Sequence, residues 1–248
     1  MRMNSTELWE MVDDTRLQTE YTVDHLVISL QSASLEALQN IFLQYRYFTK
    51  YYSGDLGLLI FKVPDGKFKS LMAEILYEEL GNGDPVRAHT KLLDHFLLGI
   101  GVDGEDLENS LESENALLLE EARQLMLANP PAYAIGLRGM GGECLCQIYL
   151  TAVFKQLLKN PVILKIKNNI DWTFWEIHTG EVDIEHRQKV RAAINEIVDT
   201  DPSSVEQIAA GYTKAKHAWD SFWANSHRLT HSHKFSRSPY RSNSLTAR

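Results

Sequence analysis

The sequence FKSLMAEILYEELGNGDP, residues 68–85, carries apolar residues at the period of an α-helix and then changes character. Steps of three and four place these apolar side chains on one helix face. They are Phe68, Leu71, Met72, Ile75, Leu76 and Leu80. The glycines, asparagine and proline of residues 81–85 predict that the helix ends there. The segment is therefore predicted to be one amphipathic helix.

The same period extends through most of the chain. Ser34 is the candidate N-cap of a long helix over 35–63, which Pro64-Asp65-Gly66 ends. Further helices are predicted over 92–97, 117–127, 133–158, 162–177, 183–198 and 204–225. We find no convincing pair of alternating strand segments. The predicted fold class is all-α, a single bundle of about eight or nine helices.

The composition is that of an ordinary globular protein, because 44% of the 248 residues are hydrophobic and 23% are charged. A net charge of −8 argues against a protein that binds nucleic acid over its whole surface. We expect no membrane partner either, since no apolar run approaches the roughly 20 residues that span a bilayer. With only Cys144 and Cys146, a disulfide framework is excluded and a cytoplasmic location is expected.

The composition changes near Asn225. Residues 226–248 contain five Lys and Arg, three His, many Ser and no acidic residue. Such a segment is too polar to bury a core of its own. We therefore predict a helical catalytic domain over 1–225 and a basic, Ser- and His-rich disordered tail over 226–248.

Several common chemical motifs are missing from the sequence. There is no phosphate-binding loop, and Glu-x-x-His, which supplies two ligands in ferritin-like di-iron bundles, does not occur. Asp-x-x-His occurs once, as Asp183 to His186, and His178 shortly precedes it. Both side chains of the Asp-x-x-His pair project from one helix face, as ligands of a shared metal would.

Three segments together resemble the haem-oxygenase-like di-iron oxidases and oxygenases. They are ELGNGDPVRAH at 79–89, Glu143 in a glycine-rich helical stretch, and FWEIHTGEVDIEH at 174–186. With the order of the surrounding helices, the resemblance covers most of residues 1–225. It implies a haem-oxygenase-like bundle that pairs as a homodimer and holds two ferrous ions (Fe²⁺) but no haem. Dioxygen would be the co-substrate, and a small organic molecule the substrate.

Carried over position by position, the resemblance implies six metal ligands: Glu79, His89, Glu143, His178, Asp183 and His186. Carboxylates would offset the charge of two irons and bridge them, while neutral imidazoles complete the donor set. Glu78 competes with Glu79 for its role. Glu181 competes with Asp183, and manganese competes with iron. For Glu143, the alternative is a buried salt bridge with Arg138.

The spacing between His178 and Asp183 departs from the family pattern by one extra residue. Along an unbroken helix this spacing would turn His178 about 140° from Asp183, too far to share a metal. We therefore predict a bulge or break at Thr179-Gly180, with a local π-turn at Gly180 restoring the register. Upstream, Tyr51-Tyr52-Ser53 stands where some family members have another glutamate, and these tyrosines are candidate hydrogen-bond donors.

Two other functions fit the same fold. A metal-free hydrolase resembling the thiaminase-type branch would use Cys144 or Cys146 as nucleophile, which requires a thiolate activated by a nearby base. A non-catalytic binding protein would not need the candidate ligands to converge. Convergence of the six residues in one cavity would separate the oxidase from the binding protein.

Overall fold

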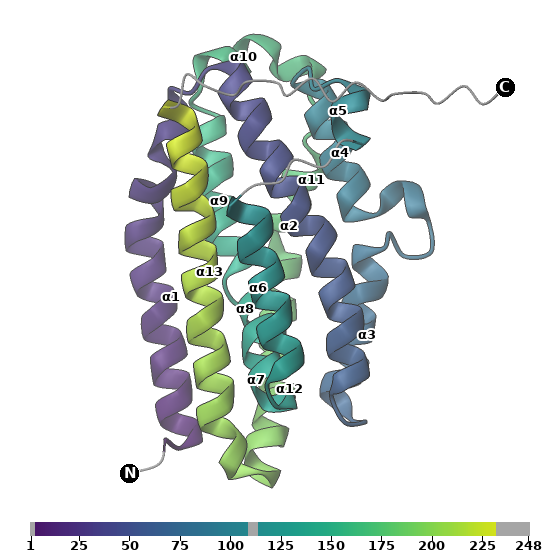
Figure 1. Cartoon of the computed structure of the whole chain (residues 1–248), viewed down its shortest axis with the longest axis vertical. Coiled ribbons are helices and arrows are strands. Elements are labelled where there is room, and N and C mark those ends of the chain that lie inside the picture. The colour runs from purple at the N-terminus through teal and green to yellow at the C-terminus, as the bar shows by residue number, and fades with distance from the viewer. Residues whose placement is uncertain (1–2, 109–113, 232–248) are drawn as a thin grey trace, which may run out of the picture.

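Every regular element within the described residues of the computed structural model is helical, which confirms the predicted all-α class (Figure 1). The structure describes residues 3–108 and 114–231, but the side chains of residues 108, 181–184 and 229–231 lie outside that description. Most long helices run along the length of the molecule, and α10 (Pro161–Ile166) lies across one end (Figure 1).

The four longest helices frame the bundle. α1 (Ser5–Val27) lies beside α13 (Val205–His231), and α2 (Leu35–Lys62) packs against α13 from the interior (Figure 1). α12 (Glu181–Thr200) packs against α3 (Lys67–Glu79). The remaining helices of intermediate length are α4 (His89–Gly99), α6 (Glu114–Ala128) and α9 (Cys146–Leu157).

Short helical pieces connect these elements. The α-helical pieces are α5 (Gly104–Glu108), α7 (Pro131–Ala134), α8 (Gly141–Glu143) and α11 (Thr173–His178). The 3₁₀ turns are η1 (Ile28–Gln31), η2 (Pro85–Arg87), η4 (Lys167–Asn169) and η5 (Pro202–Ser204). One π-helical segment, η3 (Ile135–Met140), lies between α7 and α8.

Side-chain caps set several helix starts. The Ser34 hydroxyl accepts a hydrogen bond from the backbone N–H of Ala37, which confirms Ser34 as the N-cap of α2. Asn160 caps α10, and its buried amide also donates to the carbonyls of Leu30 and Ala33. One asparagine therefore ties the start of α10 to the connection between α1 and α2.

Aromatic rings of α2 and α13 form the centre of the bundle. Tyr45 and Phe48 of α2 pack against Trp219, Phe222 and Trp223 of α13, with ring centroids 4.2 to 6.0 Å apart. All five side chains are buried. At about 25 cal/mol per Å², burying one such ring contributes about 4 kcal/mol before entropy is subtracted. This core fixes how α2 and α13 lie against each other.

The prediction of one continuous helix over 133–158 is wrong. The segment divides into α7, η3, α8 and α9, with a turn at Cys144 and Leu145. A Cβ at Gly136 would overlap the carbonyl oxygen of Ile208 in α13, so the two backbones approach more closely than side chains allow. At the turn, Arg16 donates a hydrogen bond of 2.9 Å to the carbonyl of Cys144. The close approach of α13 and the hydrogen bond from Arg16 therefore stabilise an interrupted helix in this segment.

The prediction of one helix over 162–177 is also wrong. The chain leaves the helical conformation at Ile170, which is extended (φ −95°, ψ 131°) and buries its side chain. Its backbone lies against Gly99, where a Cβ would approach the Cα of Ile170 to 2.9 Å. Packing against α4 therefore separates α10 and η4 from α11.

The predicted tail begins too early. α13 continues past Asn225 to His231, and the buried hydroxyl of Ser226 donates to the carbonyl of Phe222 at 2.9 Å. His227 contacts the hydroxyl of Ser29 through its Nδ1 at 2.7 Å. The polar side chains of Ser226 and His227 therefore extend α13 by packing within the helix and against η1. The rest of the predicted tail, residues 232–248, lies outside the described residues.

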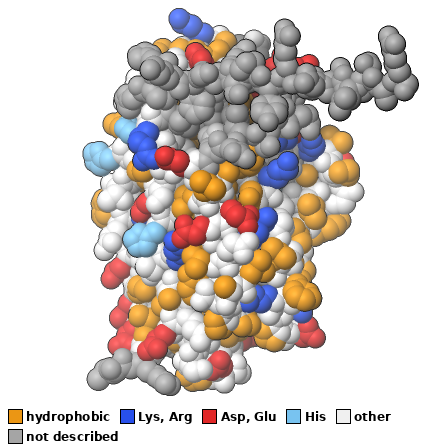
Figure 2. Space-filling view, in the orientation of Figure 1, with side chains coloured by type: hydrophobic (Ala, Val, Ile, Leu, Met, Phe, Trp, Pro, Cys, Tyr) orange, Lys and Arg blue, Asp and Glu red, His pale blue; other side chains and the backbone are white. Residues whose placement is uncertain are grey.

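The described surface in Figure 2 mixes acidic, basic and apolar side chains over the same face. Among the helices of the described ranges, none combines the length and the apolar character needed to cross a membrane.

Candidate metal centre

A cavity of about 270 Å³ opens among α2, α3, α4, α11, α12 and the α8–α9 turn. Five of the six predicted ligands line it, namely Glu79, His89, Glu143, His178 and His186. They come from five different helices, so only the tertiary fold brings them together. The sixth, Asp183, belongs to α12, but its side chain lies outside the described residues.

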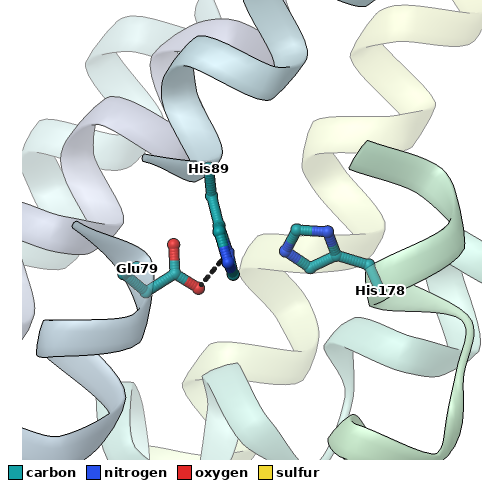
Figure 3. A group of neighbouring side chains, drawn as sticks. All are labelled: Glu79, His89 and His178. Atoms are coloured by element: carbon teal, nitrogen blue, oxygen red, sulfur yellow. Dashed lines mark ion pairs between the residues drawn. The ribbon is translucent and has the colours of Figure 1, made fainter. Parts of the chain in front are cut away.

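Glu79, His89 and His178 form the tightest group in the cavity. One potential ligand atom from each lies within 4.8 Å of the other two. Nδ1 of His89 is 3.0 Å from Oε1 of Glu79, and the rings of His89 and His178 are 4.7 Å apart. The three side chains point toward one another from α3, α4 and α11 (Figure 3).

The turn after α3 positions two members of this group. Glu79 is the last residue of α3, and the three residues Gly81, Asn82 and Gly83 all have positive φ. A Cβ at Gly81 would overlap the backbone of Asp84, which makes glycine necessary for the tight turn. The predicted end of the helix at this point is confirmed. The chain then returns through η2, and His89 begins α4 beside Glu79.

His178 is held with one ring nitrogen available. Its Nδ1 donates a hydrogen bond of 2.7 Å to the carbonyl of Phe174, one turn earlier in α11. Burial lowers the pKa of His178 to about 4, and the nearby His89 adds to the effect. The ring is therefore neutral at pH 7, and Nε2 keeps the lone pair that a metal needs.

The carboxyl of Glu79 stays ionised although it is largely buried. Burial alone would raise its pKa, but the neighbouring imidazole of His89 lowers it, with smaller contributions from His178 and His186. The net pKa lies below the ordinary value. A buried anion that faces several imidazoles is suited to a cation shared among them.

A second group surrounds His186 on the other wall of the cavity. Its Nε2 is 3.0 Å from Oε2 of Glu78, and its Nδ1 is 3.4 Å from Oε2 of Glu143. The hydroxyl of Tyr52 donates to the other oxygen of Glu143. Glu78 and Glu79 do not compete for one position, because both line the cavity, with Glu79 beside His89 and Glu78 beside His186.

The helix carrying His178 breaks where the residue spacing predicts. α11 ends at His178, Gly180 is extended (φ −89°, ψ −167°), and α12 begins at Glu181. The proposed π-turn at Gly180 is wrong, because the backbone separates two helices instead of bulging within one. The Thr179 hydroxyl donates to the carbonyl of Trp175 at 2.8 Å, which satisfies one carbonyl at the open end of α11.

Arg138 is not the partner of Glu143. Arg138 is buried and pairs with Asp55 at 2.5 Å, and Asp55 also pairs with Arg123 at 2.6 Å. The alternative role of Glu143 as the anion of an Arg138 salt bridge is therefore wrong. Glu143 is nearly buried, and its contacts with His186 and Tyr52 turn it into the cavity.

The two cysteines have different environments. Cys144 is buried away from the cavity, and burial raises the pKa of its thiol to about 12. Cys146 is partly exposed and lines the cavity. A thiolate nucleophile at Cys144 is disfavoured, because the thiol stays protonated at neutral pH.

Some cavity residues were not singled out from the sequence. Trp219 of α13 lines the cavity, as does Arg87 of η2. Trp219 is hidden in the apolar pattern of its helix, where a core role is the ordinary expectation. Arg87 lies inside the quoted 79–89 segment, but only the fold of the turn places it at the cavity.

The donor set suits iron. Carboxylate oxygens and neutral imidazole nitrogens are the usual ligands of non-haem iron. Three carboxylates, Glu78, Glu79 and Glu143, face three histidines in one cavity, and a divalent cation would offset their negative charge. The residues present therefore fit a resident metal.

Comparison with known proteins agrees with this geometry. A family described as iron-containing redox enzyme matches residues 40–220. None of the curated proteins compared with the chain matches it significantly.

A CADD-like protein of unknown function from Nostoc punctiforme is similar over 89% of this chain and 99% of its own, with 19% identity and a TM-score of 0.69. A heme oxygenase-like domain of unknown function from Shewanella denitrificans is similar over 97% of this chain and 100% of its own, with 17% identity and a TM-score of 0.64. These structures confirm the haem-oxygenase-like fold. Because the family match spans most of the chain, the protein belongs to the family of iron-containing redox enzymes.

Proposed function

We propose that the protein is a non-haem di-iron oxidase or oxygenase that uses dioxygen to oxidise a small organic substrate. The observation that carries this proposal is the convergence of three carboxylates and three histidines in one largely enclosed cavity. Such a donor set matches two divalent cations better than one, because the six side chains form two groups and each group could hold one cation.

The residues divide into two sets of ligands. Glu79, His89 and His178 would hold one iron, since their donor atoms already lie within 4.8 Å of one another. His186, Glu143 and Glu78 would hold the second, with Asp183 or Glu181 as a further donor. When bound, ferrous iron would supply the electrons that reduce dioxygen.

The other cavity residues would orient the substrate and limit access of water. Tyr45, Phe48 and Trp219 give the cavity a buried aromatic wall. Tyr52 would hold the Glu143 carboxylate through its hydroxyl. A homodimer is also part of the proposal and is supported by the family resemblance alone. The cytoplasmic location is supported only by the low cysteine count.

Anaerobic titration with ferrous iron tests the proposal. We expect about two irons per chain, and faster oxygen uptake when a reductant and air are then supplied. A manganese titration in parallel shows which metal binds more tightly. Failure to retain iron after gel filtration would contradict the proposal.

One observation supports the alternative function, a metal-free hydrolase, because Cys146 lines the cavity. Iron-free protein that cleaves an aminopyrimidine, and loses that activity in Cys146→Ser, would favour the hydrolase. Iron binding that persists in Cys146→Ser is the result expected for the oxidase.

A further inference from the structure

The cavity has a buried aromatic part and an exposed polar part. Phe48 and Trp219 are buried, and their ring centroids are 4.2 Å apart. Asn82 and Arg87, which also line the cavity, are exposed and belong to the connection between α3 and α4. A ligand that fills this space therefore meets both buried apolar rings and exposed polar groups.

The backbone around Arg87 is held in place. Its N–H donates to the carbonyl of Asp84 at 2.9 Å, and Pro85 restricts the first residue of the same 3₁₀ turn. The turn packs so closely on Gly81 that a Cβ there would overlap it. Arg87 therefore occupies a defined position between two predicted ligands, Glu79 and His89.

Arg87 is the one Lys or Arg among the described residues that line the cavity. None of the ion pairs found in the described part of the chain includes it. An arginine placed this way offers a planar pair of N–H donors that matches a carboxylate in two parallel hydrogen bonds. The glutamates beside the histidines are already engaged, so the matching anion is expected from the ligand.

The size of the cavity limits the ligand. Its volume of about 270 Å³ is below the roughly 300 Å³ at which pockets for drug-sized molecules begin. A coenzyme or nucleotide is too large for this space. A single ring or a short chain that ends in a carboxylate fits both the volume and the mixed apolar and polar lining of the cavity.

We propose that the substrate is a small amphipathic carboxylate, with its carboxylate on the Arg87 guanidinium and its apolar part against Phe48 and Trp219. This assignment rests on the proposed di-iron function, because it names the substrate class of the same site. Arg87 then sets specificity by fixing which end of the substrate enters the cavity first.

Calorimetric titration of the full chain with two matched probes tests this assignment. The probes are 3-phenylpropanoate and its neutral amide, which has nearly the same size and no charge. Each is titrated into metal-free protein and into protein loaded anaerobically with ferrous iron. We expect the acid to bind loaded protein about tenfold more tightly than the amide, as a charge-assisted hydrogen bond provides.

Variants assign this preference to one residue. Arg87→Gln should weaken acid binding about tenfold and leave amide binding within about twofold. Arg87→Lys should recover only part of the loss, because an ammonium lacks the planar fork. Arg191→Gln is the matched control, since Arg191 is exposed, pairs with Asp13 at 3.1 Å and does not line the cavity. It should change neither affinity.

Three results would overturn the inference: equal affinity for acid and amide, an acid preference that survives Arg87→Gln, or no binding of either probe to loaded protein. The metal-free titrations separate this failure from that of the proposed function. If two irons bind and the Arg87-dependent preference is absent, only the substrate class is wrong. If no iron binds but metal-free protein shows the preference, the carboxylate site stands and the oxidase proposal fails.

Discussion

The hydroxyl of Tyr52 in α2 donates a hydrogen bond to Oε1 of Glu143 in α8, and Oε2 of the same carboxylate lies 3.4 Å from Nδ1 of His186. Burial raises the pKa of Tyr52 well above its ordinary value, and the charge of Glu143 raises it further. The phenol therefore remains a donor at every physiological pH. One tyrosine thus orients a predicted ligand whose short helix offers little rigidity of its own.

Tyr52→Phe should weaken iron binding about tenfold while leaving the fold intact, because losing a group that orients a ligand typically costs 10- to 100-fold in metal affinity. Competition with a chelator under anaerobic conditions measures the change. Tyr51→Phe is the control, since the Tyr51 hydroxyl bonds to Glu120 at 3.1 Å outside the cavity. Equal losses in the two variants would show that the Tyr52 contact does not support metal binding.

Glu79→Ala should reduce the iron content from about two per chain to about one or less, because it removes the carboxylate that faces His89 and His178. Metal analysis after gel filtration gives the stoichiometry, and circular dichroism checks the helical content. Glu185→Ala is the comparison, since Glu185 is next to His186 in sequence but pairs with Lys189 at the surface. Full iron content in Glu79→Ala would remove Glu79 from the ligand set.

The metal-free protein should lose stability as the pH falls from about 6.5 toward 4. Burial lowers the pKa of His178 to about 4, so between these pH values the unfolded chain binds a proton that the folded chain excludes. The contribution of His178 is fully present above about pH 6.5. It amounts to about 3 kcal/mol at most, from the size of the shift.

Urea unfolding of metal-free protein at several pH values measures this dependence. His178→Gln should flatten it between pH 4 and 6.5, whereas His95→Gln, at an exposed site beside Asp171, should not. Parallel curves for the wild type and His178→Gln would mean that His178 does not titrate in this way.

Gly136→Ala should destabilise the protein by at least about 2 kcal/mol, because the new methyl group would overlap the carbonyl of Ile208 and push η3 away from α13. Gly57→Ala is the comparison at a helical glycine that has open space around it. A Cβ at Gly57 meets nothing within 4 Å, so this change should stabilise α2 by about 0.5–1 kcal/mol. The free energy of unfolding in urea gives both values, and a neutral Gly136→Ala would mean that the close approach is not needed.

Local sequence patterns predicted the fold class and most of the residues that line the candidate site. Apolar periodicity and stop signals such as Gly81-Asn82-Gly83 are local properties, so the end of α3 and the start of α2 at Ser34 could be read directly. The spacing of His178 and Asp183 likewise predicted a break at Thr179-Gly180, because helix geometry alone makes a continuous helix incompatible with a shared metal.

Contacts between helices that are distant in sequence determine where some helices are interrupted. The division of 133–158 follows from the approach of α13 to Gly136, and the break at Ile170 follows from its packing against Gly99. The partners of Glu143 and Glu78, and the place of Arg87 at the cavity, also depend on that packing. Those partners are distant in sequence, and which side chains share a cavity depends on how whole helices pack, which no local pattern specifies.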